Sequence, residues 1–357
     1  MSELVLIASD LYRAASDIPH PDRAALLPSL SRIARYGAVE PLPAGWRAWL
    51  AAWLGRGDLA SAPPASIAGV APIASAAPAP GVGVRAPEKS VQPFLWLADP
   101  VHLIVGPTSV YLAPNGVLAL DAGTQRALAS AFDEQFAQSG YRLEPLRAGR
   151  FLLRGPAPAG ELHTTESARI LGASLAEALP RGRGASALRA LGAEIEMWLH
   201  EHPLNAQRTR ERRPPISTLW LWGGGPPLGA DVRCASRESP SAAIFGDDAY
   251  MEGLARLCGA RFAAAPADLA ALAAADDAPR RSVALELLRF EESSLEAGPL
   301  AALERFERDW IAPALGRLAA GVLARLTILA NDRRLSIGAR DRFRLWRRPR
   351  AALAVLR

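Results

Sequence analysis

Short apolar runs alternate with helical patterns at both ends of this chain, and this alternation constrains its fold most strongly. Near the start, an apolar run over residues 4–8 precedes a helical pattern over 23–36, which Gly37 can end. The last third carries strand patterns at 241–245, 283–290, 326–330 and 351–356, and helical patterns at 250–258 and 298–323, the last with a break expected at Pro313. This order is typical of a parallel sheet covered by helices. We therefore predict an α/β core sheet built from both ends of the chain.

The middle of the chain, residues 94–235, combines strand and helix patterns in a different way. Strand patterns lie over 99–120, 150–154 and 218–222, and helical patterns lie over 124–136 and 188–200. The second of these helices is expected to end at His202, because the residue before a proline disfavours helical backbone. We predict an inserted α+β domain over these residues.

Residues 60–93 differ in composition from both of these regions. They are rich in Ala, Pro, Ser and Gly, and charge enters only with Arg85, Glu88 and Lys89. Such a stretch lacks the apolar side chains needed for a core of its own, so we predict a flexible linker or a large loop. The core domain would then comprise residues 1–59 and 236–357.

Length and composition narrow the class of protein. A chain of 357 residues accommodates about two domains. Cys234 and Cys258 are isolated, with no spacing typical of a metal site, and no apolar stretch is long enough to form a membrane span or a signal sequence. Lys89 is the only lysine, and we attribute the uniform arginine bias to base composition. We expect a soluble, cytoplasmic protein with no membrane partner.

The segment 199–225 is the most informative for function. It holds His200, His202, Asn205 and four arginines, at 208, 210, 212 and 213, before the triplet Gly223, Gly224 and Gly225. Arginine forks match phosphate and carboxylate groups, and a glycine turn lets backbone N–H groups approach an anion. A site for a phosphorylated metabolite is one interpretation, and a solvated basic helix followed by a tight turn is the other. The two histidines are two residues apart and would point to different faces, so we expect no shared metal.

Two further patterns have structural interpretations. Trp46, Trp49 and Trp53 share one helical face, which favours core packing. The basic run 340–350 interleaves Phe343 and Trp346 and could contact a nucleic acid or an acidic partner. Because it belongs to no known nucleic-acid-binding fold, we favour a solvated surface and do not expect a nucleic-acid partner.

The stretch HPLNAQRTRERRPPISTLWLWGGG resembles a diagnostic segment of the archaeal-type, cofactor-independent phosphoglycerate mutases. The family pattern is approximately HPVNxxRxxxGxxPAN, followed by an apolar strand and a glycine-rich turn. The matching residues are His202, Pro203, Asn205, Arg208, Pro215 and the three glycines. Arg213 is taken to occupy the usual glycine, and Ile216 and Ser217 replace Ala-Asn.

Weaker similarities flank this segment. The family's entry into its inserted domain is similar to residues 99–123. Its DEAGH-plus-helix segment is similar to residues 296–315, and its strand ending in PDH is similar to residues 326–332. More narrowly, the chain resembles the bacterial RpfE-type regulatory proteins, which are distant relatives of those mutases. The resemblance implies an alkaline-phosphatase-like core sheet with an inserted α+β domain.

The departures from the family concern its chemistry. The resemblance implies two metal ions, held by Asp and His, and a serine nucleophile. The five histidines of this chain are at 20, 102, 163, 200 and 202, so none lies in the C-terminal third. Pro299 and Arg333 stand where the family has the histidines of EAGH and PDH, and the nucleophile falls near Trp46 in a stretch, 45–55, without Ser or Thr. Asp10 and Asp332 are the remaining catalytic candidates, and we expect no metal and no cofactor.

These features predict a catalytically degenerate, regulatory relative of the mutases that binds a phosphorylated metabolite or an acidic protein partner. Arg208 would be the phosphate fork, His202 and Asn205 would orient the ligand, and the three glycines would supply backbone N–H groups. One alternative is an active metal-dependent phosphoglycerate mutase or phosphatase with a rearranged site, drawing on Asp10, Asp332, Asp247 and Asp248. Another is an adaptor that uses the arginine-rich C-terminus.

Overall fold

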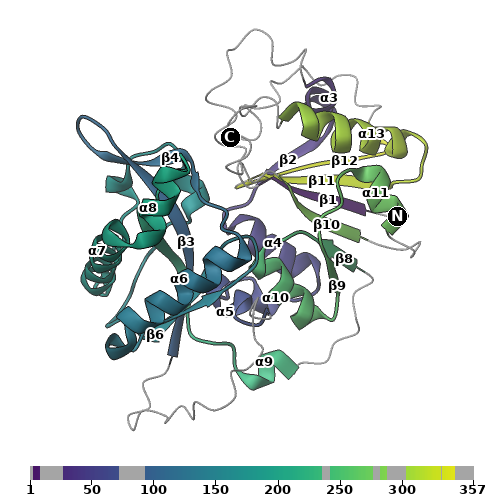
Figure 1. Ribbon diagram of the computed structural model, residues 1–357. Helices are drawn as coiled ribbons and strands as arrows, with labels where there is room; N and C mark the ends of the chain where they lie inside the picture. The colour runs from purple at the N-terminus through teal and green to yellow at the C-terminus, as the bar shows by residue number, and fades with distance from the viewer. Residues whose placement is uncertain are drawn as a thin grey trace. The chain divides into compact units, whose positions relative to one another are not determined.

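A computed structural model describes residues 3–8, 27–71, 93–234, 242–275, 282–287, 303–330 and 332–341. The chain divides into two compact units, Met1–Ser61 with Ser236–Arg357, and Ala62–Ala235 (Figure 1). The predicted strand at 351–356 and the candidate Asp10 lie outside the described residues. Among the described helices, none has the length and apolar character needed to cross a membrane.

The first unit is built on a seven-stranded sheet. Its strands are β1 (Glu3–Ala8), β2 (Ala38–Pro41), β8 (Ala242–Phe245), β9 (Arg261–Ala263), β10 (Ser282–Leu287), β11 (Arg325–Ala330) and β12 (Arg333–Gly338). Their order is β2-β12-β11-β1-β10-β8-β9, parallel from β11 to β9 and antiparallel at β12 and β2. The strands predicted at 4–8, 241–245 and 326–330 are confirmed, as is the strand predicted at 283–290 up to Leu287, beyond which the chain lies outside the described residues. The sheet joins the two ends of the chain.

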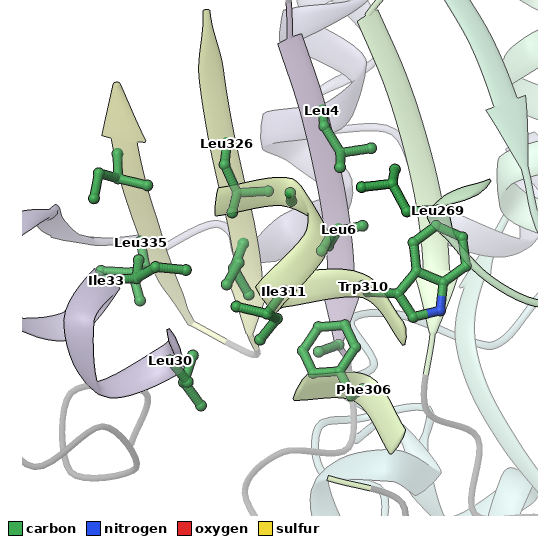
Figure 2. Packing of buried hydrophobic residues seen from close by; sticks show 14 of the residues in the cluster. Leu4, Leu6, Leu30, Ile33, Leu269, Phe306, Trp310, Ile311, Leu326 and Leu335 are labelled. Atoms are coloured by element: carbon green, nitrogen blue, oxygen red, sulfur yellow. The ribbon is translucent and has the colours of Figure 1, made fainter. Parts of the chain in front are cut away.

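Helices cover this sheet and bury its apolar side chains. The helices are α3 (Pro28–Tyr36), α4 (Gly45–Trp53), η1 (Gly57–Leu59), α10 (Ala249–Cys258), α11 (Leu269–Ala275) and α13 (Ala312–Ala319). Leu4 and Leu6 lie on the same side of β1, because side chains alternate along a strand. They pack in one cluster with Trp310 and Ile311 from the segment before α13 (Figure 2).

The segment before α13 is irregular. Residues Glu307–Ile311 are π-helical, and residues 298–302 of the predicted long helix lie outside the described residues. Pro313 has no N–H to donate to the preceding turn, which accounts for the loosened hydrogen bonding just before it. The buried carboxylate of Glu307 accepts the backbone N–H groups of Ser29 and Leu30 at the start of α3. The irregular segment thereby fixes the neighbouring helix.

The second unit contains a five-stranded sheet centred on one long strand. Its strands are β3 (Pro93–Val105), β4 (Val110–Val117), β5 (Arg142–Pro145), β6 (Phe151–Pro156) and β7 (Thr218–Gly225). β3 pairs antiparallel with β4, β6 and β7, and β5 pairs with β6. Its helices are α5 (Pro64–Ala68), α6 (Ala122–Gln135), η2 (Ala137–Ser139), η3 (Ser167–Ile170), η4 (Leu175–Glu177), α7 (Ala185–Glu201), α8 (Pro203–Arg210) and α9 (Ala230–Cys234). α6 and α7 bury their apolar faces against the sheet.

The stretch predicted to be a linker, 60–93, is in part folded. Helix α5 lies within it, and Ala65, Ile67 and Ala68 on that helix are fully buried. This part of the prediction is wrong because alanine-rich segments need little space and can pack closely. Gly225 of β7 makes that packing possible, since a Cβ atom there would lie 2.4 Å from Pro63. Residues 72–92 lie outside the described residues.

Candidate ligand-binding site

The candidate site lies where α7 passes into α8. α7 ends at His202, as predicted, and His202 also begins α8 with extended backbone and Pro203 after it. The Nδ1 atom of His202 accepts the backbone N–H of Leu204 at 3.1 Å. Burial lowers the pKa of this imidazole, so it is neutral at neutral pH. A neutral ring that accepts at Nδ1 carries its proton on Nε2, which makes Nε2–H a hydrogen-bond donor.

Asn205 joins the end of α7 to the entry of β7. Its Nδ2 donates to the carbonyls of Leu199 at 2.7 Å and Ile216 at 2.8 Å, and its Oδ1 accepts the N–H of Ile216 at 2.8 Å. The side chain is buried. These three hydrogen bonds engage the side-chain amide within the fold, whereas the sequence predicted that this amide orients a ligand.

Arg208, the predicted phosphate fork, is also held internally. Only 3% of its surface is exposed, and its Nε donates to the carbonyl of Pro214 at 2.7 Å. It therefore fixes the turn that follows α8. Arg210, two residues further on, is exposed and makes no hydrogen bond or ion pair with any described residue.

The turn after α8 contains a strained residue. Arg212 has φ +57°, a left-handed conformation that favours glycine. The usual glycine of the pattern therefore corresponds to Arg212 rather than to Arg213, which corrects the sequence alignment by one residue. Hydrogen bonds from Asn205 to Ile216 and from Arg208 to Pro214 join the helix before the turn to the chain after it, and this support allows the strained backbone to persist.

The three glycines lie at the other end of β7. That strand spans roughly 20 Å, so Gly223, Gly224 and Gly225 are distant from His202. A Cβ atom on Gly224 would lie 2.7 Å from the ring of Trp96, and one on Gly225 would meet Pro63. The N–H of Gly223 donates to Oγ1 of Thr164 at 3.1 Å. The structure thus gives the triplet a packing role and does not bring it together with the other predicted residues.

A pocket of about 790 Å³ opens beside His202. It is lined by Leu103, Glu196, His200, Glu201, His202, Asn205, Ala206, Thr209, Arg210, Pro215, Ile216 and Ser217. Arg210 and the Nε2–H of His202 are the donors suited to an anion. The two carboxylates that line the pocket, Glu196 and Glu201, both come from α7. Partial desolvation by the surrounding atoms raises the pKa of Glu196, which favours its neutral form. Glu196 and Thr209 were missed from the sequence, although Glu196 lies one turn before His200 on the same helical face.

Two of the aspartates considered as catalytic candidates, Asp332 and Asp248, make hydrogen bonds within the first unit. The backbone carbonyl of Asp332 accepts the N–H of Leu42 at 2.6 Å, and the buried Asp248 caps α10 by accepting the N–H of Met251 at 3.1 Å. Trp46 is 4% exposed and packs edge-on against Tyr250 with ring centres 5.8 Å apart. The guanidinium of Arg47 lies over the Trp46 ring at 4.3 Å. Across the described residues, no three His, Cys, Asp or Glu side chains are grouped so that they could hold a metal ion.

A segment of this chain is similar to phosphoglycerate mutases. It is 39% identical over 56 residues to a probable 2,3-bisphosphoglycerate-independent phosphoglycerate mutase of Geobacter sulfurreducens. It is 37% identical over 57 residues to the 2,3-bisphosphoglycerate-independent phosphoglycerate mutase of Methanothrix thermoacetophila. Each match covers 16% of this chain and 14% of the relative. No family model matches the chain.

Two solved structures are similar over most of the chain, but at low scores. The PH0037 protein from Pyrococcus horikoshii has a TM-score of 0.45 at 14% identity, with 94% of this chain and 87% of that chain covered. The cofactor-independent phosphoglycerate mutase from Thermoplasma acidophilum has a TM-score of 0.38 at 15% identity, with 94% and 89% covered. Both TM-scores are below 0.5, so the mixed α/β fold rests on the strand order given above.

Proposed function

We propose that this protein binds a small phosphorylated metabolite beside His202 and serves a regulatory role without mutase chemistry. The observation that carries the proposal is the pocket that Arg210 and His202 line, with the guanidinium of Arg210 and the Nε2–H of His202 both without a hydrogen-bond partner among the described residues. A guanidinium and a neutral imidazole donor suit phosphate oxygens. In this proposal Arg210, rather than the predicted Arg208, contacts the phosphate, because Arg208 is buried.

The loss of mutase chemistry is supported by the first unit. The resemblance places the serine nucleophile near Trp46, and a buried indole packed against Tyr250 offers no nucleophilic oxygen there. Asp248 is engaged in capping a helix. Within this proposal the core sheet is alkaline-phosphatase-like, the second unit is its insert, and the regulatory role is of the RpfE type in a bacterial cytoplasm.

Isothermal titration calorimetry with 3-phosphoglycerate and with inorganic phosphate tests the proposal. Arg210→Ala should weaken binding of the phosphorylated probe roughly tenfold to a hundredfold, because it removes a charge-assisted hydrogen bond. Arg126→Ala is the matched control, since Arg126 is an exposed arginine on α6 that does not line the pocket. We expect the control to bind like the wild type.

Two results would contradict the proposal. One is that the wild-type protein binds neither probe. The other is that Arg210→Ala and Arg126→Ala bind equally well. Binding of an acidic peptide in place of both probes would instead favour a protein partner.

A further inference from the structure

A second groove, of about 310 Å³, lies between α7 and β7. Its floor is apolar and consists of Leu188 and the β7 residues Leu219, Trp220 and Leu221, which are buried. Leu179 stands at its rim and is 40% exposed. A Cβ atom added to Gly192 would meet no atom within 4 Å, so the surface of α7 is open at the centre of the groove. An apolar surface of this kind is typical of a contact with another molecule.

Two opposite charges stand at the two ends of the α7 side of this groove. Arg189 and Glu196 both line it and lie seven residues apart, on one helical face and about 10 Å apart along the helix axis. Neither makes a hydrogen bond or an ion pair within the part of the chain that the structure describes. Burial raises the pKa of Glu196, so a cation beside it would be favourable.

The midpoint of this charge pair falls between Gly192 and Ala193. A second α7, antiparallel and related by a two-fold axis through that midpoint, would bring its Arg189 to Glu196 and its Glu196 to Arg189. We propose that the α7 groove is the isologous interface of a homodimer, occupied by the same groove of a second copy. Its charge pattern is complementary to itself, which a single strongly basic or acidic partner would not match.

The shape of α7 agrees with this occupant. Gly192 and Ala193 are small, so two helices can approach closely at the centre. The helix has 17 residues, so about 25 Å of it is available for contact.

This interface does not depend on the ligand proposed above. Glu196 also lines the pocket beside His202. The dimer would therefore place the partner's Arg189 at the edge of that pocket and would add a cation to it.

Sedimentation velocity over a dilution series of the full chain tests the interface, and we expect a dimer. Arg189→Glu and Glu196→Arg each turn two attractive pairs into two repulsive pairs. Each should raise the dimer dissociation constant by about a hundredfold or more. Glu194→Arg makes the same charge change on the same helix, outside the groove, and should remain dimeric.

An equimolar mixture of the two single variants tests the charge pairing directly. Arg189→Glu paired with Glu196→Arg restores both attractive contacts, so an equimolar mixture should form a heterodimer although each variant alone is monomeric. That result also shows that both variants are folded. A monomeric wild type, single variants that stay dimeric, or a mixture that stays monomeric would each overturn the proposal.

Discussion

The two units use their polar side chains in different ways. In the first unit, Asp248, which follows β8, caps α10, and Trp46 fills the space beside Tyr250. In the second unit, Arg189, Glu196 and Arg210 are presented at two pockets without partners among the described residues. A sequence motif can therefore indicate where a site lies, but binding requires polar side chains that do not already hydrogen-bond within the fold.

The largest expected effect concerns the packed region of the first unit. Trp46→Ala should lower the free energy of unfolding by about 4 kcal/mol, because it removes a buried indole and leaves a cavity. Urea unfolding measures this, with Trp46→Phe as a milder control. Phosphate binding by the folded variant should be unchanged. A variant of wild-type stability would show that this region is not packed as described.

The next effect concerns the motif asparagine of the second unit. Asn205→Ala should lower the free energy of unfolding by about 3 kcal/mol, since it leaves the buried N–H of Ile216 and two carbonyls without partners. Gln207→Ala, on the exposed side of the same helix, should change it by less than about 0.5 kcal/mol. If Asn205→Ala kept full stability and lost only phosphate binding, Asn205 would be a ligand contact, and the distinction between motif and site would fail.

The smallest effect concerns the strained turn after α8. Arg212→Gly should raise the free energy of unfolding by about 0.5–1 kcal/mol, because glycine adopts a positive φ without steric cost. Arg213→Gly is the matched control and should lower it, since Arg213 has no positive φ and pairs with Glu211. Thermal unfolding of both variants measures the difference. A stabilised Arg213→Gly would instead support the original alignment of the glycine.

Much of the first sheet was predictable because β1, β8 and β11 are predominantly apolar, which is how buried parallel strands are composed. β12 was missed because it begins with Arg333 and Arg334, and such charged residues are not typical of a strand that lies between two others, here β2 and β11. Helix α5 was missed because an alanine-rich composition resembles that of a linker. Compositional signals of this kind do not reveal whether a neighbouring glycine makes room for close packing.

The sequence indicated the segment that carries the candidate site, but it did not indicate how the side chains of that segment are arranged. The segment around His202 was identified, and its pocket lies there. The sequence could not show that Asn205 and Arg208 turn inward, because burial depends on the turn at Arg212 and on the position of residues 214–216. Nor could it show that α7 supplies Glu196 to the pocket, since that depends on how the helix packs against β7.

The central claim is that this chain binds an anion without a two-metal centre. The most direct measurement is elemental analysis of the purified full chain after exposure to manganese and zinc, followed by removal of unbound metal. The account predicts a negligible amount of bound metal, with phosphate binding retained. About two equivalents of metal per chain, lost in Asp332→Ala, would contradict it and would indicate an active metal-dependent enzyme.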